Sequence, residues 1–92
     1  MLIPPGTTVI VSQNLAVADL GDEAVLLDPE TGNYFGLNEV AARILELAAT
    51  ETTVDRIVKA LLDEYDVDRS RLEGDVSTFV RDLESKGLLD IR

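Results

Sequence analysis

The residues with the most chemical potential in this 92-residue sequence are its carboxylates, because it contains 18 Asp and Glu but no His and no Cys. Asp28, Glu30 and Glu39 stand at the first, third and twelfth places of one segment, where a calcium-binding EF-hand loop also has carboxylates. Pro29 and Gly32 do not fit such a loop, and the preceding residues have a strand pattern where an EF-hand needs a helix. The segment therefore favours a turn, and we expect no metal site.

Catalysis by this chain has little support in its residues. Without His and Cys, a Ser-His-Asp triad, a thiol nucleophile, a disulfide and metal sites built on imidazole or thiolate are excluded. Neighbouring carboxylates such as Asp82 and Glu84, and the lysines Lys59 and Lys86, fall on the polar faces of predicted helices. No Gly-rich phosphate loop is present. We expect a protein that is not an enzyme by itself and has no cofactor.

The net charge limits the partners that this chain can have. Eight Lys and Arg against 18 Asp and Glu give a formal charge of −10, which repels nucleic-acid phosphates and anionic membranes. No apolar run approaches the roughly 18 residues of a membrane span, and residues 1–5 have no secretory signal pattern. We therefore expect a cytoplasmic protein that binds neither nucleic acid nor a membrane.

The elements that would position a site follow from the hydrophobic pattern, which predicts one α+β domain over residues 1–92. Residues 15–37 contain short apolar runs separated by turn signals, at Gly21-Asp22 and in the cluster 28–33. They predict a three-stranded antiparallel sheet. Residues 1–14 include a β-branched run and are expected to form an N-terminal arm or an extra strand.

Residues 38–92 are predicted to form three amphipathic helices. Asn38, Thr52 and Ser70 stand where the three helices need N-caps, and Gly87 suits the C-terminal end of the third helix. The apolar residues of the second and third helices recur at helical spacing. In the second helix they are Val54, Ile57, Val58, Leu61, Leu62 and Tyr65, and in the third Leu72, Val76, Phe79, Val80 and Leu83.

The last predicted strand and the third helix carry more apolar residues than a core of this size must bury. The last strand of the sheet also leaves an open edge, and an open edge beside an apolar helix stripe is what β-strand addition of a peptide requires. Pattern alone leaves two interpretations and favours the first: the residues close the core, or they line a peptide groove. They are Tyr34, Phe35, Leu37, Val76, Phe79, Val80 and Leu83.

A small sheet followed by three helices is also typical of a winged-helix DNA-binding regulator. Arg69, Arg71 and Arg81 lie on or near the third helix, whose equivalent enters a DNA groove. The same helix carries four carboxylates, and the whole chain is strongly acidic. The DNA-binding interpretation is therefore the less favoured one.

Three stretches of the sequence resemble the PqqD-like family, also called the RiPP recognition element, over about residues 15–90. The first is Leu26-Leu27-Asp28-Pro29 followed by Gly32-Asn33-Tyr34-Phe35-Gly36-Leu37-Asn38 and Ala42-x-Ile44-Leu45. The second is Thr53-Val54-x-x-Ile57-Val58 with Tyr65-x-Val67-Asp68. The third is Asp75-Val76-x-x-Phe79-x-x-x-Leu83-x-x-x-Gly87-Leu88-Leu89.

This resemblance implies a winged helix-turn-helix-like domain that binds the leader segment of a ribosomally made precursor peptide. The leader would add as an antiparallel strand on the third strand, in the cleft between that strand and the third helix. The implied peptide-binding residues are Asn33, Tyr34, Phe35, Gly36 and Leu37 in the strand, and Asp75, Val76, Phe79, Val80 and Leu83 in the helix.

The resemblance is greatest to the free-standing recognition subunit of lasso-peptide biosynthesis. Such a subunit delivers the precursor to a separate, transglutaminase-like leader peptidase, and its leaders offer a Tyr and a Pro to hydrophobic pockets. The alternative is a PqqD-type chaperone that presents its peptide to a radical-SAM enzyme. In either case the negative charge of this chain favours a leader that carries Lys or Arg.

Overall fold

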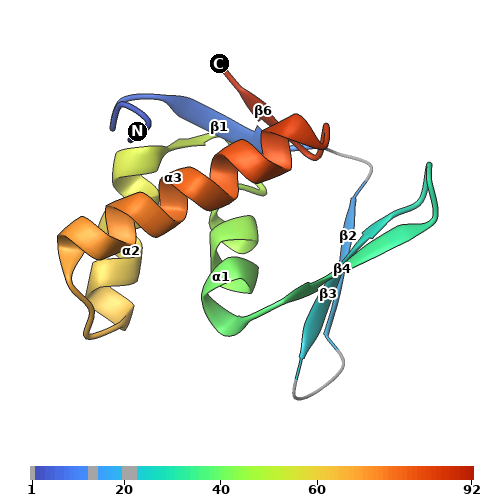
Figure 1. The fold of residues 1–92 in the computed structure, drawn as a ribbon, viewed down its shortest axis with the longest axis horizontal. Coiled ribbons are helices and arrows are strands. Elements are labelled where there is room, and N and C mark those ends of the chain that lie inside the picture. Colours follow the sequence, from blue (N-terminus) through green and yellow to red (C-terminus); the bar gives the residue numbers. More distant parts are fainter. Residues whose placement is uncertain (1, 13–14, 20–22) are drawn as a thin grey trace.

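In the computed structural model, residues 2–12, 15–19 and 23–92 are described, and these residues form two three-stranded antiparallel sheets and three helices (Figure 1). The α+β fold expected from the sequence is confirmed. The hairpin turn expected at Gly21-Asp22 lies outside the described residues. Of the helices that are described, none combines the length and the apolar character needed to cross a membrane.

The predicted three-stranded sheet consists of β2 (Ala16–Asp19), β3 (Ala24–Asp28) and β4 (Asn33–Leu37), in that order across the sheet. The turn between β3 and β4 is built as its residues predict. The Asp28 carboxylate accepts a hydrogen bond from the Glu30 N–H at 3.1 Å. Gly32 has φ +76°, a conformation that glycine adopts without strain. The turn interpretation of this segment is confirmed.

The second sheet was not predicted. It consists of β5 (Thr52–Thr53), β1 (Thr8–Val11) and β6 (Leu89–Ile91), with β1 in the centre. The β-branched run near the N-terminus thus forms an extra strand, one of its two expected forms, but it lies in the second sheet and not at the edge of the first. Its Val9 is fully buried, because the two ends of the chain pair with each other over the core. Residues 38–92 accordingly contain two short strands besides their helices.

The helices are α1 (Glu39–Leu47), α2 (Val54–Glu64) and α3 (Arg69–Ser85). The predicted cap of α1 is confirmed, since the Asn38 side chain accepts from the Ala41 N–H at 2.7 Å. At the end of α3, Gly87 has φ +75° and the expected closing bonds form. They run from the Gly87 N–H to the carbonyl of Glu84 and from the Leu88 N–H to that of Leu83, both at 2.9 Å.

Two of the predicted helix caps are wrong by one or two residues. Thr53, rather than Thr52, caps α2 by accepting from the Arg56 N–H at 3.2 Å, and both threonines pair with β1. Asp68, rather than Ser70, caps α3, and its carboxylate accepts from the Arg71 N–H at 3.1 Å. Ser70 lies within the first turn of α3.

The core joins both sheets to the helices. Figure 1 shows α3 running across the molecule from the α2 side toward the sheet of β2, β3 and β4. The buried apolar residues of α2 and α3 all belong to the predicted apolar stripes, and Leu26 of β3 brings the first sheet into the same core. The largest fully buried side chains are Leu26, Ile57, Leu61, Leu89, Val9, Val76 and Val80.

Candidate peptide-binding site

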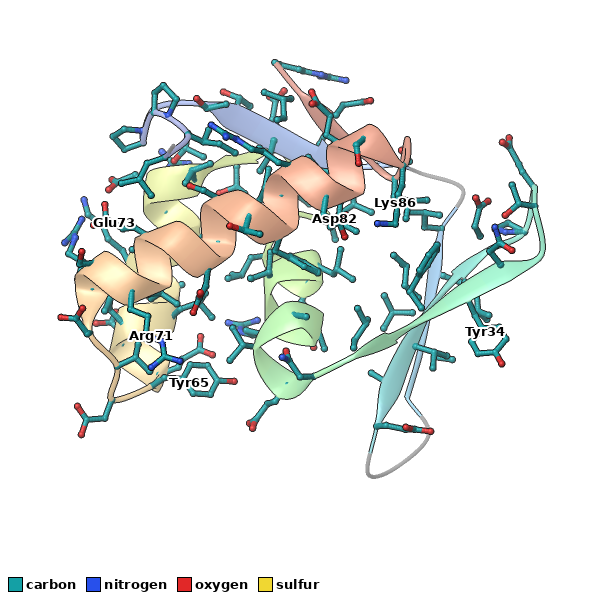
Figure 2. The ribbon with its side chains drawn as sticks, in the orientation of Figure 1. Tyr34, Tyr65, Arg71, Glu73, Asp82 and Lys86 are labelled. Carbon is teal, nitrogen blue, oxygen red and sulfur yellow. The ribbon has the colours of Figure 1, made fainter. Side chains whose placement is uncertain are left out.

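Strand β4 forms an edge of its sheet within the described part of the chain. Cross-strand partners share a face of a sheet, so the pairing of Phe35 with the fully buried Leu26 places Phe35 on the core side. Leu37, 8% exposed, is on the same side. Tyr34 and Gly36 are on the opposite face, and Tyr34 is 71% exposed and points away from α3 (Figure 2). The alternation expected from the sequence is confirmed.

Between β4 and α3 lies a cavity of about 410 Å³, here called the strand cavity. It is bordered by an ion pair at the C-terminal end of α3, in which Nζ of Lys86, the residue after the helix, lies 2.6 Å from Asp82 Oδ1 (Figure 2). Lys86 Nζ also lies 5.9 Å from the centre of the Phe35 ring, within the range of a cation–π contact. The lining residues are Leu26, Tyr34, Phe35, Gly36, Leu37, Phe79, Asp82, Leu83 and Lys86.

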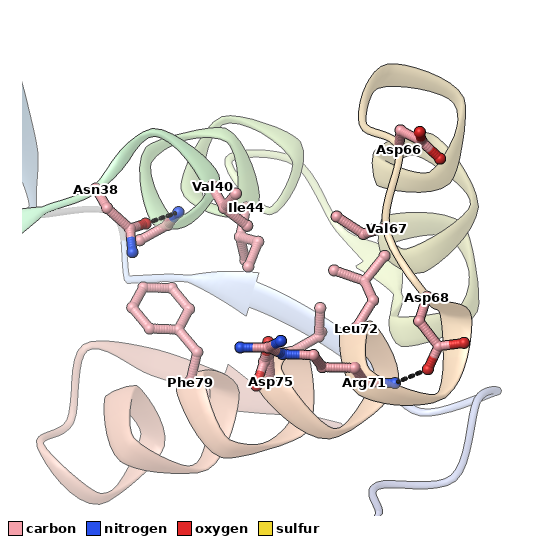
Figure 3. Close-up of a pocket in the computed structure, with 12 residues that line it drawn as sticks. Asn38, Val40, Ile44, Asp66, Val67, Asp68, Arg71, Leu72, Asp75 and Phe79 are labelled. Carbon is pink, nitrogen blue, oxygen red and sulfur yellow. Dashed lines mark hydrogen bonds between the residues drawn. The ribbon is translucent and has the colours of Figure 1, made fainter.

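A second cavity, of about 550 Å³, lies among α1, α3 and the segment that joins α2 to α3, and is here called the helix cavity (Figure 3). Phe79 lines both cavities, so they are neighbours along α3, and the two together are here called the path. The lining is mainly apolar with a charged border. The apolar residues are Val40, Ala41, Ile44, Val67, Leu72, Val76 and Phe79, and the polar ones are Asn38, Asp66, Asp68, Arg71 and Asp75.

The wall formed by α1 is fixed to α2 by an exposed but well-aligned ion pair. Arg43 Nε lies 2.9 Å from one carboxylate oxygen of Glu64, and its Nη2 lies 2.9 Å from the other. These hydrogen bonds hold the pKa of the Glu64 carboxyl below its ordinary value. At the end of α2, burial raises the pKa of Tyr65, with a further contribution from the nearby Glu39 carboxylate.

Most of the residues predicted for the site lie along this path. Tyr34, Phe35, Gly36, Leu37, Phe79 and Leu83 line the strand cavity, and Asp75, Val76 and Phe79 line the helix cavity. Asn33 is exposed at the start of β4 and lines neither cavity. Val80 also lines neither cavity and is fully buried, so it supports the groove from within the core.

Of the charged residues that border the two cavities, sequence reasoning identified Asp75 but missed Asp66, Asp68, Arg71, Asp82 and Lys86. Arg71, Asp75, Asp82 and Lys86 stand at spacings of three or four residues on either side of Phe79, so they follow one stripe of α3. This helical spacing around Phe79 was the feature of the sequence that could have identified them. Polar residues on a helix were interpreted as a solvated face, because pattern alone does not show which face meets β4.

Neither a metal-holding cluster nor a buried side-chain polar atom without a partner accompanies the groove in residues 2–12, 15–19 and 23–92. No three carboxylates there are grouped so as to hold a metal ion. The buried side-chain polar atoms of this part of the chain all have hydrogen-bond partners. The described residues thus offer an apolar path with an open strand edge and a charged border.

The fold and this path define a class: a small α+β domain in which an edge strand faces a helix across an apolar groove, a geometry suited to taking up a peptide strand. The model of the family Coenzyme PQQ synthesis protein D (PqqD) matches residues 23–89. The chain belongs to this family, as its sequence motifs indicated.

Three solved structures are similar to the chain over most of its length. TbiB1 in complex with the TbiA(beta) leader peptide is 41% identical with a TM-score of 0.77, over 88% of this chain and 94% of the other. A lasso peptide synthetase B1 complexed with the leader peptide is 28% identical with a TM-score of 0.71, over 89% and 96%.

The third is the PqqD truncation of Methylobacterium extorquens PqqCD, which represents a functional, stand-alone RiPP recognition element. It is 26% identical with a TM-score of 0.73, over 90% of this chain and 88% of the other. A search of curated proteins finds no match. Two of the three similar structures thus hold a leader peptide.

Proposed function

We propose that this chain binds the leader segment of a ribosomally synthesised precursor peptide and presents it to a separate leader peptidase in lasso-peptide biosynthesis. The leader adds as an antiparallel strand on the edge of β4 and lies against α3. The observation that carries the proposal is the strand cavity, which lies between an open strand edge and a helix. The likeness to TbiB1, whose solved structure holds a leader peptide, supports it.

The groove offers a leader two kinds of contact. The free N–H and C=O groups of β4 give backbone hydrogen bonds, which bind an extended peptide regardless of its side chains. Phe35, Leu37, Phe79 and Leu83 give the strand cavity apolar walls, so that alternate side chains of the added strand select the sequence. The contribution to the pathway is a high local concentration of the precursor at its enzyme, and no reaction barrier is lowered by this chain itself.

The test is a calorimetric titration of the TbiA(beta) leader peptide into the protein, since a 41% identical relative binds it. We expect a dissociation constant in the micromolar range or below, about −8 kcal/mol or stronger. Duplex DNA at physiological salt is the control, and a chain of charge −10 is expected not to bind it. Tight binding of DNA with no binding of the peptide would instead favour the winged-helix regulator.

Presentation to a peptidase requires a surface for that enzyme, and the outer face of the first sheet suits this role. The cross-strand register places only apolar residues on the two described rungs of that face: Ala16, Leu27 and Tyr34, then Ala18, Val25 and Gly36. A sheet face in contact with water normally carries polar residues. Since this face includes β4, an enzyme docked on it would also lie beside the bound leader.

Docking of the enzyme can be tested separately from leader binding by placing a charged residue on the outer face of the first sheet. The Leu27→Asp variant replaces a side chain that is 38% exposed, so we expect it to fold and to bind the leader as the unaltered protein does. Leader removal by the partner peptidase is expected to slow. Unchanged leader removal would show that the enzyme docks elsewhere.

A PqqD-type chaperone that serves a radical-SAM enzyme is the second candidate. It is favoured by the family model and by the structural likeness to the PqqD truncation. Both functions use the same groove. They are distinguished by whether the protein accelerates leader removal by a peptidase or peptide modification by a radical-SAM enzyme.

A further inference from the structure

We infer that the helix cavity receives the part of the leader that precedes the added strand, and that this part carries a basic side chain. The inference rests on the proposed function, in which the leader adds antiparallel to β4. It goes further because it assigns a direction to the peptide, a second binding region, and a chemical type to the leader residues that lie there.

The direction of the peptide follows from the direction of β4. This strand runs from Asn33 to Leu37, and the next residue, Asn38, lines the helix cavity. An antiparallel strand runs the opposite way, so its N-terminal end lies beside Leu37 and its C-terminal end beside Asn33. Residues that precede the added strand therefore lie toward the helix cavity, which neighbours the strand cavity at Phe79.

The two ends of the path differ in charge. The helix cavity is bordered by three carboxylates and one guanidinium, so the formal charge of its border is −2. They belong to Asp66, Asp68, Asp75 and Arg71. At the other end, Asp82 and Lys86 also line the path but neutralise each other in their ion pair.

The carboxylates that border the helix cavity remain available to a ligand. In the described part of the chain, Asp66 and Asp75 form no ion pair, and Asp68 uses one oxygen to cap α3. The end that meets the N-terminal part of the leader is thus the acidic one.

The shape of the helix cavity suits a long basic side chain. The interior is formed by apolar residues such as Val40, Ile44 and Leu72, and the carboxylates stand at its border (Figure 3). Lys and Arg place an apolar stem along such a surface and keep the charged group near water. At the neutral end of the path, a basic side chain would face an Asp82 carboxylate that is already paired with Lys86.

The experiment uses the TbiA(beta) leader peptide and three derivatives of it, with binding measured by anisotropy in about 0.01 M salt, where the Debye length is about 30 Å. Hydrogen exchange of the bound peptide first identifies the protected segment, which is the added strand. One derivative places two Lys just before this segment, another places two Glu there, and the third places two Lys just after it. The protein is tested unaltered, as the double variant Asp66→Asn with Asp75→Asn, and as the control Glu84→Gln, an exposed α3 carboxylate that lines neither cavity.

We expect two Lys before the segment to bind about two- to tenfold more tightly than two Glu there, and more tightly than two Lys after it. The double variant should remove this preference, and Glu84→Gln should keep it. Equal binding of the derivatives, or a stronger effect of Lys placed after the segment, would overturn the inference while leaving leader binding in place. If none of the peptides binds, the proposed function fails and the inference fails with it.

Discussion

Truncation of Phe79 to alanine is the most direct test of the groove, because this half-buried side chain lines both cavities. A bound leader would cover what remains exposed of the ring. An aromatic side chain buries about 150–250 Å², and if on the order of 50 Å² is left to the leader, its burial is worth about 1.3 kcal/mol. Lost packing against the leader adds to this, so we expect a loss of about 1–3 kcal/mol, or about 5- to 150-fold in the dissociation constant.

The same change will also lower stability, so binding and folding must be measured together. Calorimetric titration of the TbiA(beta) leader peptide is run beside thermal melts, at a temperature where each variant is folded. The control is Ile57→Ala in α2, a fully buried residue that lines neither cavity. It should cost about 2–5 kcal/mol of stability without changing the affinity of the folded protein. If Phe79→Ala melts early but binds the leader normally, Phe79 belongs only to the core and the site assignment is wrong.

Three further changes test other parts of the structure. The N–H groups of successive β4 residues point alternately toward β3 and out of the open edge. Proline removes this N–H, so one of the variants Tyr34→Pro and Phe35→Pro should abolish leader binding without unfolding the domain. Equal calorimetric titrations for the two variants would contradict strand addition. Gly87→Ala forces alanine to φ +75° and should lower the melting temperature by about 4–8 °C, for a cost of about 1 kcal/mol. Because Arg43 lowers the pKa of Glu64, their ion pair stabilises the fold fully above pH 4.5, the ordinary pKa, and this stabilisation is lost as the pH falls through the lowered pKa. Glu64→Gln should therefore make the melting temperature less sensitive to acid in that range of pH. An unchanged pH profile of the melting temperature would exclude this role.

The helices could be predicted because each carries a local, repeated signal. In α2, apolar residues recur at helical spacing along the whole element, and all its fully buried residues belong to that stripe. The second sheet has no such signal. Its strands β5 and β6 have two and three residues, too few to show a period, and both are far from their partner β1 in the sequence. Pairing at such separation depends on the shared core, which no local pattern encodes.

The strand and helix of the candidate site could be predicted, but of the charged residues along it only Asp75 was identified. Residues Tyr34 to Leu37 could be identified because they form an aromatic strand at the end of a meander, and the last strand of a meander has one unpaired edge. Lys86 could not, since an isolated lysine near the end of a helix is most often solvated. Its ion pair with Asp82 is a local contact at i,i+4 spacing, but only the packing of α3 beside β4 brings its ammonium near the Phe35 ring. The role of such a residue depends on which face of a helix meets which strand.

The acidity of the chain also affects which partners can pair with the open edge of β4. An unpaired edge strand can pair with the edge of a second copy as readily as with a peptide, and the apolar outer face beside β4 adds to that tendency. Two copies that each carry a formal charge of −10 repel each other as their edges approach. A leader with Lys or Arg is instead attracted, most strongly at the end of the groove bordered by Asp66 and Asp75. The charge that is expected to repel nucleic acid would thus also disfavour self-pairing, and under the proposed function it would make the edge of β4 selective for a basic peptide.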